Sequence, residues 1–81
     1  AYPNPIAKGE VLKVGYELEK DQTLSLIIIN RTGQVIRREE HTVFITEEYI
    51  EVSTKGFETG LNLIRIIDES GNTATLKIII R

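Results

Sequence analysis

His41 is the only histidine of the chain, so any imidazole chemistry would depend on this one side chain. A Ser-His-Asp triad needs an imidazole held between a nucleophile and a carboxylate, and a structural zinc site needs several histidine or cysteine ligands. The chain has no cysteine, and it therefore has no thiolate ligand, cysteine nucleophile or disulfide. We interpret His41 as a surface residue and predict no catalytic residue and no metal site.

Carboxylates occur as adjacent pairs, at residues 39–40, 47–48 and 68–69. Neighbouring residues of a strand point to opposite faces, so the two members of a pair do not converge on one substrate. Residues 68–72 read Asp-Glu-Ser-Gly-Asn, which lacks the alternating oxygen ligands and the later glutamate of a calcium loop. We interpret this segment as a hairpin turn, and the carboxylate pairs as solvating groups that limit aggregation of an isoleucine-rich chain.

Charge and hydropathy argue against two classes of partner. Ten Lys and Arg against twelve Asp and Glu give a net charge of −2, whereas a phosphate-backbone binder needs a basic excess. The one adjacent basic pair, at residues 37–38, is followed at once by two glutamates. The apolar runs at 26–29 and 78–80 are far shorter than the ~20 residues of a spanning helix. We predict no nucleic-acid partner, no membrane span and, without a glycine-rich phosphate loop, no cofactor.

Short β-strands are the elements expected to carry these residues. Most of the thirteen isoleucines lie in short runs separated by Gly, Asn, Asp and Ser, which is typical of an antiparallel sandwich. A chain of 81 residues suffices for one domain. We predict an all-β, immunoglobulin-like antiparallel β-sandwich of about seven strands. The expected strands are residues 11–18, 22–30, 35–40, 42–46, 49–53, 61–67 and 73–81.

Several of these strands are apolar on both faces, although each sheet of a sandwich has only one inner face. The surplus residues, opposite those assigned to the core, are Ile27, Ile29, Leu63 and Ile79. They form either a contact patch, for a partner or for a second copy in a weak homodimer, or a surface covered by loops and by the stems of Arg37 and Arg65.

Both prolines of the chain lie in its first five residues. Pro3 and Pro5 fix their own φ and bias Tyr2 and Asn4 towards extended conformations. Because proline lacks the amide hydrogen that a central strand needs, this stretch is expected to be a lead-in or an edge strand. We predict a proline-containing linker at residues 1–6 and a single domain at residues 7–81.

Four segments, taken in order, resemble the type A C-terminal sorting domain of the type IX secretion system of Bacteroidetes. They are Tyr-Pro-Asn-Pro at residues 2–5, the strand and turn that end in Asn-Arg-Thr-Gly-Gln-Val at 30–35, Phe57 with Gly60, and the basic β-branched end at 77–81. Each segment is weakly specific alone, but together they cover essentially the whole chain. Asn62 departs from the family pattern, which usually has tyrosine there.

The resemblance implies a non-catalytic sorting signal. Such a domain directs a passenger protein, fused upstream, across the outer membrane, and a sortase-like protease usually removes it. Its partners would be the secretion machinery and that protease, and its location would run from the periplasm to the outer membrane, the cell surface or the medium. The residues implied in recognition are Tyr2, Pro3, Asn4, Pro5, Gly33, Gly60, Lys77 and Arg81.

The alternative is an immunoglobulin-like structural or adhesive module of an extracellular or cell-surface protein. A carbohydrate-binding module would be expected to present an aromatic platform. The chain has three Tyr, two Phe and no Trp, which offers little for such a platform.

Overall fold

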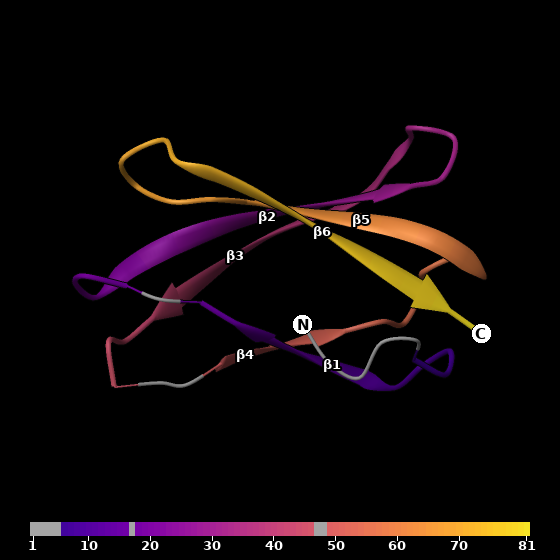
Figure 1. The fold of residues 1–81 in the computed structure, drawn as a ribbon, viewed down its shortest axis with the longest axis horizontal. Helices are drawn as coiled ribbons and strands as arrows, with labels where there is room; N and C mark the ends of the chain where they lie inside the picture. The colour runs from indigo at the N-terminus through magenta and orange to yellow at the C-terminus, as the bar shows by residue number, and fades with distance from the viewer. Residues whose placement is uncertain (1–5, 17, 47–48) are drawn as a thin grey trace.

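Within the described residues, six strands form two antiparallel sheets (Figure 1). The computed structural model describes residues 6–16, 18–46 and 49–81. The strands are β1 (Val11–Gly15), β2 (Gln22–Asn30), β3 (Val35–Val43), β4 (Tyr49–Ser53), β5 (Gly60–Ile67) and β6 (Thr73–Ile80). β1 pairs with β4, and the other four form a sheet in the order β3-β2-β5-β6. The predicted all-β, immunoglobulin-like sandwich is confirmed.

The predicted count of seven strands is wrong, because β3 continues through residue 41, which was expected to separate two strands. His41 pairs with Leu24 and Thr42 with Thr23, so the ladder continues to Val43. No glycine, proline or asparagine interrupts residues 39–43, and nothing local therefore ends the strand. Only the first two residues of the strand expected at 42–46 are part of a strand, as the end of β3.

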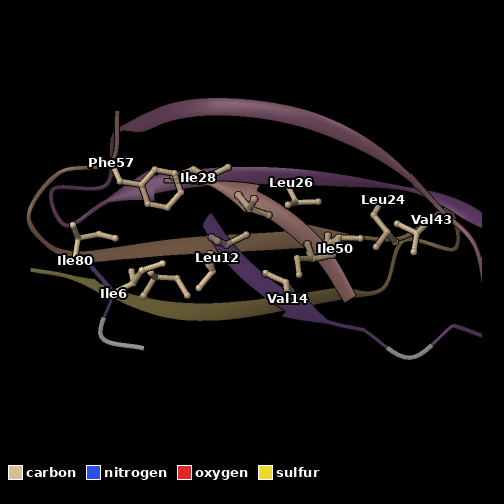
Figure 2. Packing of buried hydrophobic residues seen from close by; sticks show 14 residues of the cluster. Ile6, Leu12, Val14, Leu24, Leu26, Ile28, Val43, Ile50, Phe57 and Ile80 are labelled. Carbon is tan, nitrogen blue, oxygen red and sulfur yellow. The ribbon is translucent and has the colours of Figure 1, made fainter. Parts of the chain in front are cut away.

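The core lies between the inner faces of the two sheets (Figure 2). In β2 and β5 alternate residues are buried, as the period of two requires, while the outward residues are partly or fully exposed. Half-buried Tyr16 and Leu76, together with Leu18 and Ile36, pack against the margin. In the part of the chain that the structure describes, the buried apolar residues are Ile6, Leu12, Val14, Leu24, Leu26, Ile28, Val43, Ile50, Val52, Phe57, Ile64, Ile66, Ile78 and Ile80.

The strand β3 turns charged side chains towards the interior. In the register of β2 and β3, Arg37 and Glu39 lie opposite Ile28 and Leu26, whose side chains are buried. Paired residues share a face, so both charged residues are on the inner face. The second sheet has two strands against four in the first. A charged inner margin is consistent with a sheet whose edge is only partly covered.

The two ends of the described chain meet at β6. Ile6, which is 1% exposed, forms a parallel bridge with Ile80. Its amide donates to the carbonyl of Ile79 at 2.9 Å, and its carbonyl accepts from the amide of Arg81 at 2.9 Å. Ile6 therefore pairs with backbone groups at the outer edge of β6. Without this pairing, those amide and carbonyl groups would be left exposed at the edge of the sheet.

Candidate functional site

Segments that are far apart in the sequence gather at one end of the sandwich. Asn30 at the end of β2 pairs with Asn62, and Gly60 at the start of β5 pairs with Ile80. In Figure 1 the β2–β3 turn, the start of β5 and the C-terminus all lie on the right-hand side. We call this region the motif end and define it by Ile6 and by residues 30–35, 57–62 and 78–81.

The side chain of Asn30 organises the turn between β2 and β3. Its Oδ1 accepts from the amide of Thr32 at 3.1 Å, from the Thr32 hydroxyl at 2.8 Å and from the amide of Gln34 at 3.0 Å. Gly33 has φ of 87°, a value that L side chains rarely adopt. The motif glycine is therefore needed for the turn, whatever a partner reads there.

Glu58 joins this turn to the start of β5. The Nδ2 of Asn30 donates to the Glu58 carboxylate at 3.3 Å, and the Nδ2 of Asn62 donates to the Glu58 carbonyl at 2.7 Å. Gly60, with φ of 100°, lets the chain turn into β5. Asn62 is fully buried, and its Oδ1 has no partner within the described residues. An unpaired buried acceptor costs about 1–3 kcal/mol of stability, a cost specific to having asparagine here.

Arg37 ties the edge strand β3 to the segment after β4. Its Nη1 donates to the Lys55 carbonyl at 3.1 Å and its Nη2 to the carbonyl of Ser53. The guanidinium carbon lies 5.1 Å from the centroid of the Phe57 ring, a cation–π distance. Sequence reasoning missed this contact, since nothing in the local pattern shows that Ser53 and Lys55 lie near Arg37.

His41 belongs to the same charged row and makes a structural contact. Its Nε2 lies 2.7 Å from one oxygen of Glu39, and the other oxygen of Glu39 lies 2.8 Å from the Nε of Arg37. The Glu39 carboxylate therefore links Arg37 and His41, its two neighbours on the same face of β3. Among the described residues, no group of three His, Asp or Glu side chains could hold a metal ion.

The outer face of the β3-β2-β5-β6 sheet brings together the four surplus apolar residues named above. Ile29 pairs with Leu63, while Ile79 pairs with Leu61, and Ile27 lies two residues before Ile29 on the same face. Two residues outside the predicted patch lie beside it, since Val35 pairs with Ile29 and Leu61 with Ile79. Val35 is 44% exposed, Leu61 36% and Ile79 42%. We call this set of six residues the aliphatic patch.

The stems of Arg37 and Arg65 were both expected as possible covers of this patch, but only Arg65 lies on the same face as the patch. Arg37 lies on the inner face and reaches towards β4, so its stem is not over the patch. Arg65 does lie on the outer face, directly opposite Ile27. Next to it, a groove of about 580 Å³ is lined by Ser25, Leu26, Ile27, Arg38, Glu39, Glu40 and Ile67.

The residues implied in recognition are divided between the motif end and the outer face. Gly33, Gly60 and Arg81 lie at the motif end, whereas Lys77 lies on the outer face opposite Leu63. The Tyr-Pro-Asn-Pro segment at residues 2–5 lies outside the described residues, as does the carboxylate pair at 47–48. The structure does not test a recognition role for any of these residues, which stays a prediction.

At the opposite end, residues 68–72 form the hairpin turn that the sequence predicts. The Asp68 carboxylate accepts from the amide of Ser70 at 2.9 Å, and from the amide and side chain of Asn72 at 2.8 and 3.1 Å. Burial acts to raise the pKa of Asp68, but these hydrogen bonds outweigh it and hold the pKa below its ordinary value of 3.8. The carboxylate is thus engaged with amide donors.

Comparison with known proteins identifies the family. Neither a curated protein nor a solved structure matches the chain. No helix of the described residues is long and apolar enough to cross a bilayer. The sequence model of the family described as "Secretion system C-terminal sorting domain" matches residues 1–81, the whole chain. With its all-β sandwich and its four motif segments in the family's order, this chain belongs to the C-terminal sorting domains of the type IX secretion system.

Proposed function

We propose that this domain is a non-catalytic signal that directs a passenger protein, fused upstream, across the outer membrane through the type IX machinery. The observation that carries the proposal is the family match over residues 1–81. The motif segments at residues 30–35, 57–60 and 78–81 gather at one end, which supports the proposal, because a receptor could contact them as one surface. A sortase-like protease then separates passenger from domain, and the passenger reaches the cell surface or the medium.

The pairing of Ile6 with β6 indicates where the protease would cut. Ile6 is buried and paired on both its amide and its carbonyl with β6. Backbone held in this way does not enter a protease cleft without first leaving the sheet. A cut on the N-terminal side of Ile6 would release the passenger while the sandwich stays folded.

A reporter fusion tests the sorting role. The chain is joined to the C-terminus of a fluorescent protein that carries a general export leader, in a bacterium with a type IX system. We expect the reporter in the medium or on the cell surface, and in the periplasm when the chain is omitted. A wild-type fusion that stays in the periplasm would overturn the proposal and favour a structural or adhesive module.

Two cations near the C-terminus provide the sharper variant. Lys77→Ala/Arg81→Ala is expected to reduce secretion strongly, because the resemblance implies that both residues contribute to recognition. Lys8→Ala/Lys20→Ala removes the same charge from exposed positions elsewhere and serves as the matched control. The urea midpoint of each isolated variant shows that it is folded. Normal secretion of the first variant would show that the charges of Lys77 and Arg81 do not contribute to recognition.

A further inference from the structure

The outer face of the β3-β2-β5-β6 sheet is divided into an aliphatic part and a hydroxyl part. The aliphatic patch lies towards the motif end, where Val35, Ile29 and Leu63 follow one another across three strands. Serine and threonine predominate in the far part, which also holds Glu40 and Ile67, both opposite Ser25. The two ends of this face therefore differ in chemistry, so a partner could bind it in one orientation only.

Two arginines stand at the boundary between these parts. Arg38 and Arg65 lie directly opposite Ile27, one on each side of it. Their backbones are two strand spacings apart, about 10 Å. Both residues are exposed, and neither forms an ion pair within the described residues. Lys77 adds a third cation to this face, and Glu40 is the one carboxylate among its described strand positions.

Charge argues against a second copy of the chain as the occupant. Two identical outer faces packed together would set three cations and one carboxylate against the same set, which is unfavourable.

An anionic bilayer fits the whole molecule poorly. Each cation near such a surface contributes about 1 kcal/mol of attraction, but the chain as a whole carries a net charge of −2. The described strand positions of the outer face include no aromatic residue that could anchor in the interface. A protein surface of complementary charge remains as the occupant.

We propose that this outer face is a docking surface for a protein of the export machinery that presents an aliphatic area bordered by carboxylates. Two of those carboxylates face Arg38 and Arg65, and the aliphatic area packs on the patch beside them. The inference rests on the proposed sorting function and adds to it the face that is read and the chemistry that reads it.

Charge reversal in the reporter fusion tests the electrostatic part. Arg38→Glu/Arg65→Glu is expected to reduce secretion at least about tenfold, since a loss of 1.4 kcal/mol already has that effect. Lys8→Glu/Lys20→Glu changes the net charge equally and is expected to leave secretion near the wild-type level. Arg38→Gln/Arg65→Gln replaces the first variant if its urea midpoint shows that it does not fold.

A photo-reactive amino acid at Val35 tests the identity of the occupant. Val11, on β1 of the other sheet and 47% exposed, is the matched control. We expect irradiation of secreting cells to join position 35 to a protein through a peptide rich in Asp or Glu. Changing those carboxylates to Lys is then expected to restore secretion of Arg38→Glu/Arg65→Glu.

Each contrary result has a separate meaning. Secretion of the two charge-reversal variants at equal levels would overturn the docking surface while leaving the sorting function intact. An adduct to lipid, an adduct to a second copy of the chain, or no adduct at position 35 would overturn the proposed occupant. Failure of the wild-type fusion to leave the periplasm would overturn the sorting function and this inference with it.

Discussion

At the residue scale, small polar side chains organise both ends of the sandwich. Asn30 closes the turn after β2, and Asp68 closes the turn after β5, each by accepting from backbone amides within four residues. Such local bonds are the usual role of Asn and Asp in turns. The difference between the two is charge, and it makes the second turn sensitive to acid.

Acid is expected to weaken the turn at residues 68–72. Because hydrogen bonds hold the pKa of Asp68 below 3.8 in the folded chain, its ionised form favours folding. This contribution is complete above the unfolded pKa and is lost as the pH falls through the lower, folded pKa. We expect the free energy of unfolding, measured in urea, to decrease below about pH 4.

Asp68→Asn isolates this contribution, since asparagine keeps one acceptor oxygen but does not titrate. We expect the difference in stability between wild type and variant to shrink as the pH falls through that range. A difference that stays constant from pH 6 to pH 2.5 would show that the Asp68 charge has no part in stability.

Some of these contacts could be predicted from the residue types, and others could not. Glycine in a polar turn predicts a positive φ at Gly33, and Asp-Glu-Ser-Gly-Asn predicts the second hairpin, because both signals are local. The contact of Arg37 with Phe57 depends on two segments that meet only in the folded chain. The same holds for Glu58, which contacts residues on both sides of it in the sequence.

At the element scale, alternation located most strands but could not assign every face. β2, β5 and β6 lie within one residue of their expected bounds, since their apolar residues recur with a period of two. β3 could not be predicted in full, because its inner face carries Arg37, Glu39 and His41. A polar inner face occurs where the opposite sheet is narrower, and the width of a sheet is not a local property.

The facing of β5 is open to a direct test with two neighbouring isoleucines. Ile66 is 1% exposed and points into the core, whereas Ile67 is half-buried on the outer face. We expect Ile66→Ala to lower the free energy of unfolding by about 2–5 kcal/mol, the range for large-to-small changes in a core.

Ile67→Ala is the matched control and is expected to cost much less. Chemical denaturation of the two isolated variants supplies both values. Equal losses at the two positions, or a loss below about half a kcal/mol at Ile66, would mean that the facing of β5 is wrong.

At the scale of the whole molecule, topology turns a scattered set of motifs into one region. The order β3-β2-β5-β6 places the end of β2, the start of β5 and the end of β6 at the same end of the sheet. The sequence alone did not indicate this, because antiparallel strands can be ordered in several ways. Family resemblance supplied the motifs, but their convergence required the pairing of strands.

The bridge between Ile6 and β6 also determines how the domain bears load. Ile6 runs parallel to β6, so opposite pulls on its N-terminal side and beyond Arg81 act along the paired segments. Its two hydrogen bonds are then stretched together in shear, whereas a hairpin pulled at its open end breaks one bond at a time. We expect single-molecule pulling between the chain ends to need more force than pulling between Glu58 and Arg81, which peels β6 from β5. Equal forces would show that the bridge bears no load. The expected difference would show that the bridge resists a force applied through a passenger joined at the N-terminal side.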